Sequence, residues 1–123
     1  MSSPAKAEQV VRACFDAFTA RDRKAMEALL ADDFHFTSPL DNRLDRDGFF
    51  KYCWAGGEEI QGFDIKHLLV EGERVFVTYE ARFGKKVLRN VEIQTVRGGK
   101  VVETEVYFGW EVPHPVKEGA HKG

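Results

Sequence analysis

The sequence predicts an α+β domain in which three N-terminal helices pack on the concave face of a strongly curved, mainly antiparallel sheet, giving a cone-shaped molecule. Two patterns predict this class. Apolar residues recur at helical spacing before residue 57, and they alternate with polar residues from about residue 60 to residue 112. Helices followed by a meander of long strands are typical of α+β folds. The 123 residues suit one hydrophobic core, so we expect a single domain over residues 1–123.

The composition narrows the classes of partner. A net charge of −2 and scattered Lys and Arg residues do not favour nucleic-acid binding, because a phosphate-binding surface needs clustered basic side chains. No apolar run approaches the ~20 residues of a membrane-spanning helix, and the first residues lack the apolar segment of a signal peptide. We therefore expect a cytoplasmic protein with no membrane partner. Cys14 and Cys53 match no metal-binding spacing, so we expect reduced thiols, no metal site and no cofactor.

A first helix is predicted from Pro4 to about Ala20. Ser3 can cap it, and proline is tolerated at the first helical position. Its apolar residues from Ala7 to Phe18 follow the i, i+3, i+4, i+7 spacing. They therefore form one buried stripe.

A second, shorter helix is predicted to start after Asp22 and to end at residues 31–33. A short strand over residues 34–38 follows, and Pro39 stops it. Residues 40–46 are mostly polar, which predicts a loop.

A third helix should begin at Asp45 or Asp47, carry several aromatic residues and end at the glycine pair 56–57. Gly-containing turns divide the rest of the chain, and the segments between them predict long strands. The predicted strands cover about residues 60–70, 74–83, 86–97 and 100–112. The remainder, about residues 113–123, predicts a loose C-terminal tail.

Asn90, Glu92 and Gln94 form a polar stripe along one face of the predicted strand 86–97. Either this stripe faces water, or the buried side of the sheet contains a polar pocket. A lone carboxyl group in an aromatic cavity has its charged form disfavoured, which suits a general acid or base. Glu92 is therefore the candidate catalytic residue, and its two neighbours would orient it or bind a ligand. The alternative is a solvated strand residue.

The turn after this strand leaves two registers open. If residues 98–99 form a two-residue turn, Glu92 lies opposite Glu105 on the outer face of the sheet. If residues 97–99 form a three-residue turn with a glycine bulge, Glu92 lies opposite Thr104 and faces the pocket. Two glutamates directly opposite each other are unfavourable, which favours the second register.

Other residues are candidates for the walls of such a pocket. Tyr79 alternates with apolar residues, so it is either a core residue with its hydroxyl in water or a polar contact in the pocket. For the large apolar side chains, core filling is the alternative to ligand contact. The candidate walls are Tyr52, Trp54, Val106, Phe108 and Trp110.

The histidines do not favour a histidine site. His35 is out of phase with Phe34 and Phe36, so we expect it to face away from the pocket. The phase of His67 stays open. Asp41 is either a solvated loop residue or a group at the pocket mouth.

Two short motifs accompany this order of elements: Ala-Asp-Asp-Phe at residues 31–34 and Gly-Lys-Val-Val-(x)5-Phe-Gly at residues 99–109. With them, the chain resembles the nuclear transport factor 2-like superfamily, which includes the SnoaL-like polyketide cyclases, ketosteroid isomerase and scytalone dehydratase. The resemblance implies a conical pocket between the helices and the concave sheet face, and often a dimer packed through the outer face. We therefore expect a small hydrophobic ligand and a homodimer.

Ketosteroid isomerase uses a carboxylate base and an oxyanion hole made of a tyrosine and a protonated aspartic acid. Alignment with it places Cys14 at its tyrosine, Ser38 at its base and Glu92 near its protonated acid. Two of the three groups are therefore absent, and ketosteroid isomerase activity itself is not expected. The alignment adds Cys14 and Ser38 to the candidate ligand contacts.

Three functions remain open from the sequence. The first is a SnoaL-like pocket protein that binds a compact apolar or aromatic compound and, as an enzyme, transfers a proton through Glu92 in an isomerisation, dehydration or cyclisation. The second is a non-catalytic dimeric ligand-binding or protein-interaction module. The third is association with a larger protein through the outer sheet face, where Ile93, Val101 and Tyr107 would be partly apolar.

Overall fold

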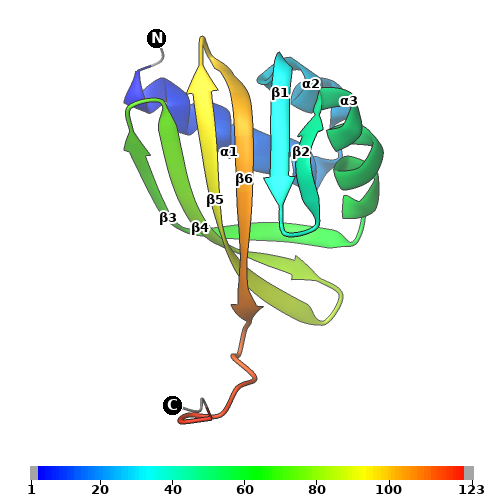
Figure 1. The fold of residues 1–123 in the computed structure, drawn as a ribbon, viewed down its shortest axis with the longest axis vertical. Coiled ribbons are helices and arrows are strands. Elements are labelled where there is room, and N and C mark those ends of the chain that lie inside the picture. Colours follow the sequence, from blue (N-terminus) through cyan, green and yellow to red (C-terminus); the bar gives the residue numbers. More distant parts are fainter. Residues whose placement is uncertain (1–2, 121–123) are drawn as a thin grey trace.

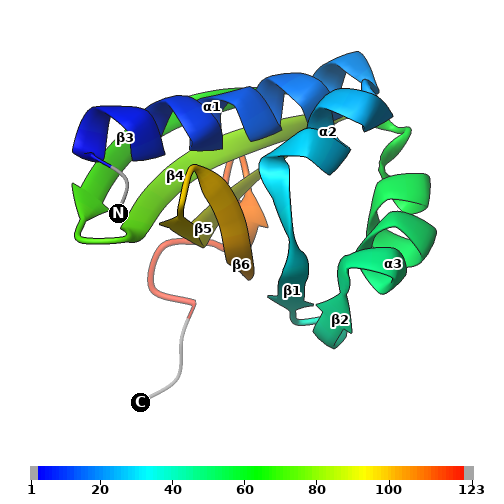
Figure 2. The same cartoon turned by 90° about the horizontal axis from the view of Figure 1, so that it is seen from above.

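Helix α1 (Pro4–Ala20) lies across the concave side of a curved six-stranded sheet (Figures 1 and 2). The computed structural model describes residues 3–120. The strand order is β2-β1-β6-β5-β4-β3, and all neighbouring strands are antiparallel except β1 and β6, which are parallel. The predicted α+β class with a curved, mainly antiparallel sheet is confirmed.

The first two helices begin where their capping residues predict. The backbone N–H of Lys6 donates to Ser3 Oγ at 3.1 Å, which satisfies one of the free donors at the start of α1. Asp22 caps α2 (Arg23–Leu29) in the same way. Helix α2 is shorter than predicted, because β1 (Leu30–Ser38) begins at once instead of at residue 34.

Strand β2 (Asp41–Asp45) replaces the predicted loop over residues 40–46. It pairs antiparallel with β1, with Phe36 opposite Leu44. An edge strand of this kind needs no apolar alternation, so its polar sequence gave no strand signal.

The third helical segment starts as α3 (Arg46–Gly48), with Asp45 as its cap: the N–H of Gly48 donates to Asp45 Oδ1 at 2.8 Å. It continues as a π-helical turn over Phe49–Trp54 and ends in a 3₁₀ turn over Ala55–Gly57. The predicted end at the glycine pair is therefore confirmed.

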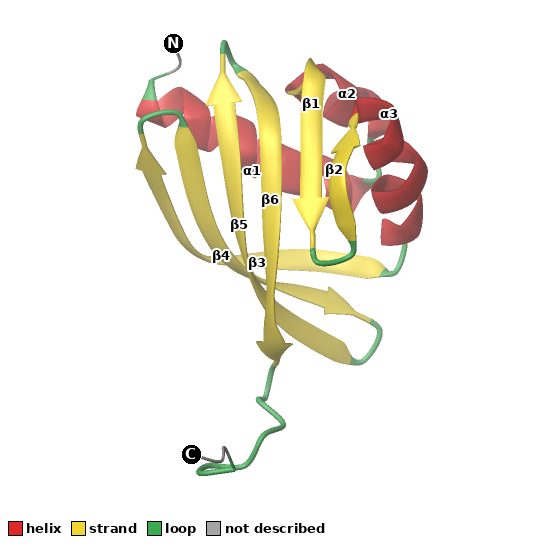
Figure 3. Cartoon of the chain, viewed as in Figure 1, coloured by secondary structure: helices red, strands yellow, loops and turns green. Residues whose placement is uncertain are grey.

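The four long strands lie close to their predicted positions (Figure 3). They are β3 (Ile60–Glu71), β4 (Arg74–Phe83), β5 (Lys86–Arg97) and β6 (Lys100–Glu111). Residues 112–120 contain neither helix nor strand. Residues 121–123, the end of the predicted tail, lie outside the described residues.

The register of the β5–β6 hairpin differs from both expectations. Arg97 pairs with Lys100 across a two-residue turn, but an extra residue of β6, Val102, then shifts the ladder by one position. Glu92 consequently lies opposite Val106, not opposite Glu105 or Thr104. It faces the concave side, as the second register expected, but through a different pairing.

This bulge and a second one redistribute the residues of β6 between the two faces. Val101, expected on the outer face, is fully buried in the core. The second extra residue is Gly109, after which Trp110 pairs with Arg89 on the outer face. A Cβ atom at position 109 would collide with the backbone oxygen of Arg89, so only glycine fits there. Trp110, expected in the pocket wall with Val106 and Phe108, is therefore not on the face that lines the cavity.

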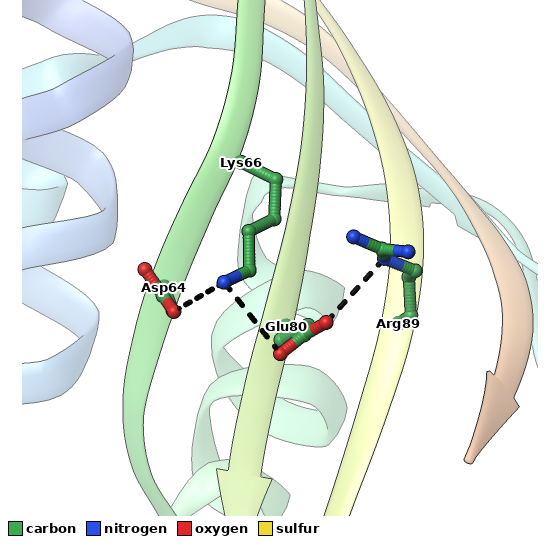
Figure 4. A network of polar contacts seen from close by, with 4 residues as sticks. All are labelled: Asp64, Lys66, Glu80 and Arg89. Carbon is green, nitrogen blue, oxygen red and sulfur yellow. Dashed lines mark hydrogen bonds and ion pairs between the residues drawn. The ribbon is translucent and has the colours of Figure 1, made fainter. Parts of the chain in front are cut away.

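The two faces of the sheet have different chemistry. On the concave face Val75, Val77 and Val96 are fully buried in the main core. On the outer face Lys66 lies between two carboxylates, and Arg89 contacts one of them from the other side (Figure 4). Among residues 3–120, no helix combines the length and the apolarity needed to cross a lipid bilayer.

Candidate functional site

A cavity of about 560 Å³ lies between the helices and the concave face of the sheet. Most of its wall is apolar and much of it is aromatic. Its polar lining consists of Cys14, Ser38, Asp41, Tyr52, Cys53, Glu59, Tyr79, Asn90, Glu92, Gln94 and Thr104. Exposed apolar side chains, Leu40, Tyr52 and Phe108, mark its mouth. A cavity of this size suits a small organic molecule.

Glu92 projects into this cavity from the middle of β5. The hydroxyl of Tyr79 donates to Glu92 Oε1 at 3.2 Å, and the side-chain amide of Gln94 donates to Glu92 Oε2. Tyr79 comes from the neighbouring strand β4, whereas Gln94 lies two residues further along β5 on the same face. Three positions of two strands are thus joined around one carboxyl group.

Burial raises the pKa of Glu92 from its ordinary 4.5 to about 7, although the hydrogen bonds from Gln94 and Tyr79 act in the opposite direction. Glu92 lines a mostly apolar cavity, and this environment disfavours the charged form of its carboxyl group. A group with this pKa is present in both protonation states near neutral pH, which is what a general acid or base requires.

Tyr79 is buried, and its ring packs edge-on against Phe15 and Phe63 at centroid distances of 5.1 and 5.5 Å. Burial raises the pKa of its hydroxyl far above the ordinary value, and the nearby charge of Glu92 raises it further. The hydroxyl is therefore neutral and serves as a hydrogen-bond donor.

Asn90 and Gln94 flank Glu92, and both are buried. Asn90 Oδ1 accepts a hydrogen bond from the N–H of Gly109 at 3.2 Å, which fastens the bulge of β6 to β5. Gln94 Oε1 has no hydrogen-bond partner among the described residues. Turning this amide over would place its oxygen against the Glu92 carboxylate, so the donor side is held toward Glu92.

Cys14 and Cys53 both line the cavity, from α1 and from the π-helical turn. Burial, and secondly the charge of Glu92, raise the pKa of each thiol to about 12. Both are therefore neutral thiols at physiological pH, and they form a polarizable, weakly polar part of the cavity wall. Ser38 also lines the cavity, and its Oγ accepts a hydrogen bond from the N–H of Leu40 at 3.1 Å.

The structure brings most of the predicted site residues together, with two exceptions. Trp54 is buried beneath the guanidinium of Arg21, 4.3 Å from its ring, and it packs against Phe18 instead of lining the cavity. Trp110 lies on the outer face beyond the Gly109 bulge, next to His114. Neither tryptophan is among the lining residues.

Sequence reasoning missed several lining residues. Cys53 was not a candidate, because the π-helical turn rotates side chains away from the positions that an α-helix would give them. Glu59, which lies in the turn before β3, was not a candidate either. Phe36 and Phe34 point inward from β1, which leaves His35 on the outer side as expected. His67 pairs with Thr78, so it also lies on the outer face.

The family model that describes the SnoaL-like domain matches residues 11–104. No curated protein matches the chain in sequence. Among solved structures, an NTF2-like protein of unknown function from Burkholderia xenovorans is 23% identical over 92% of this chain and 87% of its own, with a TM-score of 0.77.

Two further structures have similar scores. A candidate ketosteroid isomerase from Kribbella flavida is 19% identical over 98% of this chain and 90% of its own, with a TM-score of 0.75. IdmH, a candidate polyketide cyclase from Streptomyces antibioticus, is 16% identical over 83% of this chain and 91% of its own, with a TM-score of 0.74. Likeness at this level of identity establishes the shared fold and leaves the chemistry to the site.

Proposed function

The chain belongs to the SnoaL-like domain family, and we propose that its pocket binds a compact apolar or aromatic molecule with which Glu92 exchanges a proton. The observation that carries this proposal is the Glu92 carboxyl group, whose pKa is raised to about 7 inside a mostly apolar cavity. Structural carboxylates are usually paired with cations, whereas the hydrogen-bond donors to this one within residues 3–120 are the neutral groups of Tyr79 and Gln94. A residue of this kind in a cleft is a candidate for acid–base chemistry.

The arrangement suits the removal of a proton from carbon next to a carbonyl group. As a carboxylate, Glu92 takes the proton, and as a carboxylic acid it returns the proton to another atom of the same substrate. Tyr79 and Gln94 hold the two carboxyl oxygens, so the group keeps one orientation while its charge changes. Isomerisation, dehydration and cyclisation all contain such a step.

Exchange of carbon-bound protons tests the proposal. 2-Tetralone, a compact bicyclic ketone, is incubated with the protein in D₂O, and deuterium incorporation is followed by ¹H NMR. We expect catalysis by the wild type with a rate that rises through pH 7. The Glu92→Gln variant should lose about 100-fold or more of this rate, as is usual for a general base.

Glu105→Gln is the matched control, because Glu105 lies on the outer face with the hydroxyl of Tyr107 as its donor at 2.8 Å. Its exchange rate should equal that of the wild type. Wild-type exchange in a folded Glu92→Gln variant would remove Glu92 from the mechanism.

A non-catalytic binding function is the second candidate. It is favoured by Cys14 and Ser38, which occupy the positions that the sequence alignment assigns to two catalytic groups of ketosteroid isomerase. Tight binding of 2-tetralone or its analogues without any exchange would support this function.

We also propose self-association through the outer face of the sheet, where Leu69, Val91 and Tyr107 are exposed. Large apolar side chains grouped on a sheet face are typical of interaction surfaces. Sedimentation velocity at micromolar concentration tests this, and a monomer would contradict it.

A further inference from the structure

Beside Glu92 the cavity keeps hydrogen-bond acceptors available for a ligand. The Tyr79 hydroxyl and the Gln94 amide both donate to Glu92. The acceptor of Asn90 is occupied by the N–H of Gly109. Two acceptors stay available: the other lone pairs of the Glu92 carboxylate, and Gln94 Oε1, which has no partner among residues 3–120 although Gln94 is only 3% exposed. A buried acceptor without a partner is costly, so a ligand that donates a hydrogen bond here gains affinity.

The charges of the residues that line the cavity also disfavour an anionic ligand. Three carboxyl groups line the cavity: Glu92 in its interior, and Asp41 and Glu59 on loop and edge positions. Within residues 3–120 no Lys, Arg or His side chain lines it. A carboxylate, phosphate or sulfate ligand would meet like charges and no counter-ion, which makes its burial unfavourable.

A donor can be an uncharged hydroxyl or a protonated amine, and the cavity favours the hydroxyl. Its interior is built from aromatic rings and neutral groups, for example Phe15, Phe34 and Phe49. Burying an ammonium group here would add a second desolvated charge beside Glu92, and such pairs frequently fail to repay the loss of hydration. A hydroxyl donates to one of these acceptors without that cost.

We propose that the pocket selects neutral aromatic or enolic molecules that carry a hydroxyl group, which donates to Gln94 Oε1 beside Glu92 at the buried end of the cavity, and that it rejects the corresponding carboxylates. This inference rests on the binding half of the function proposed above and assigns its ligand class. The enol of 2-tetralone, which forms when the proton that Glu92 takes from carbon is returned to the oxygen, has such a hydroxyl, so the same contact would hold it. 2-Naphthol has a similar ring system and a stable hydroxyl.

A matched series of ligands tests the proposal by isothermal titration calorimetry at pH 7.5. The series consists of 2-naphthol, 2-methoxynaphthalene, 2-naphthoate and 2-naphthylmethylammonium. We expect 2-naphthol to bind about tenfold more tightly than 2-methoxynaphthalene, which lacks the donor, in line with one hydrogen bond to a buried acceptor. The naphthoate should bind most weakly.

The Gln94→Leu variant removes the unpartnered oxygen, together with the amide group that donates to Glu92, while roughly keeping the volume of the side chain. It should reduce the preference for 2-naphthol over 2-methoxynaphthalene several-fold. Glu105→Gln on the outer face is the control and should bind the whole series like the wild type.

A second variant does not require a buried position to accept a different side chain. Asp41→Asn combined with Glu59→Gln changes two lining residues outside the buried end, Glu59 being exposed. It should raise the affinity for 2-naphthoate relative to the affinity for 2-naphthol.

The outcomes separate the two proposals. Equal binding of the ether and 2-naphthol, or tighter binding of the ammonium or the carboxylate, would overturn the ligand class and leave the pocket function standing. If no member of the series binds to the folded wild type, both proposals fail.

Discussion

The two faces of one sheet hold two polar clusters with opposite electrostatics. On the concave face Glu92 has neutral partners, Tyr79 and Gln94, and its pKa rises to about 7 because burial disfavours the charged form. On the outer face Asp64 contacts the ammonium of Lys66 at 2.8 Å, and this hydrogen bond lowers the pKa of its carboxyl group (Figure 4).

The difference shows that environment, and not residue type, assigns a carboxyl group its role. Acidic residues occur on both faces of the long strands, and their alternation looks alike in the sequence. Water and a cation keep the outer carboxylates ionised, whereas desolvation prepares Glu92 for proton transfer. Four predictions test this contrast, starting with the largest effect.

Packing dominates the stability of the inner face. Phe34 is almost fully buried and packs edge-on against Phe49, so Phe34→Ala should lower the free energy of unfolding by about 3–5 kcal/mol. The neighbouring Asp33 is exposed, and Asp33→Ala should change it by less than about 0.5 kcal/mol. Urea denaturation measures both, and similar losses would contradict the assignment of the two faces.

The pH dependence of the free energy of unfolding should reflect the raised pKa of Glu92. Its folded-state pKa of about 7 lies above its ordinary 4.5, so the folded chain holds the proton more tightly than the unfolded chain. The free energy of unfolding therefore falls as the pH rises from 4.5 to 7, by up to about 3 kcal/mol. Urea denaturation of wild type and Glu92→Gln across this range isolates the effect. A constant difference between the two proteins would show that Glu92 titrates normally.

The outer cluster around Lys66 should contribute less to the free energy of unfolding, and its contribution should depend on the salt concentration. Glu80 lies 3.9 Å from Lys66 and 3.4 Å from Arg89, on a surface where water screens the charges. Glu80→Gln should change the free energy of unfolding by less than about 1 kcal/mol. In 1 M NaCl this change should shrink further, whereas the Glu92 effect should persist because it comes from desolvation. A larger effect of Glu80→Gln in high salt would contradict this distinction.

The smallest effect concerns a single titration. Asp64 should titrate below its ordinary pKa of 3.8, and Lys66→Met should return it toward that value. Carbon-13 NMR of the carboxyl groups measures the change. The pH dependence of stability from this pair has the opposite sign to that from Glu92. The stabilisation by the Asp64–Lys66 pair is present above the unfolded-state pKa of Asp64 and is lost as the pH falls through its folded-state pKa. An unchanged Asp64 titration in the variant would show that Lys66 does not act on it.

Local patterns predicted most of the fold. The caps at Ser3 and Asp22, the glycine pair 56–57 and the bounds of the long strands all follow from short-range sequence signals. Strand β2 was not predicted, because its residues lack the apolar alternation that indicates a strand. Its pairing with β1 places it in the sheet instead. The wall residue Cys53 was missed because it lies in a π-helical turn, which has no sequence signature of its own.

The amino-acid sequence by itself determined the order of the elements and the polar stripe around Glu92, since both depend on side-chain periodicity within one segment. Only the tertiary structure decided which side that stripe faces. The extra residues Val102 and Gly109 shift β6 against β5, and each shift of one residue exchanges inside and outside. Those two bulges bring Val106 opposite Glu92, bury Val101 and move Trp110 away from the cavity, so the site depends on contacts between strands that no single segment encodes.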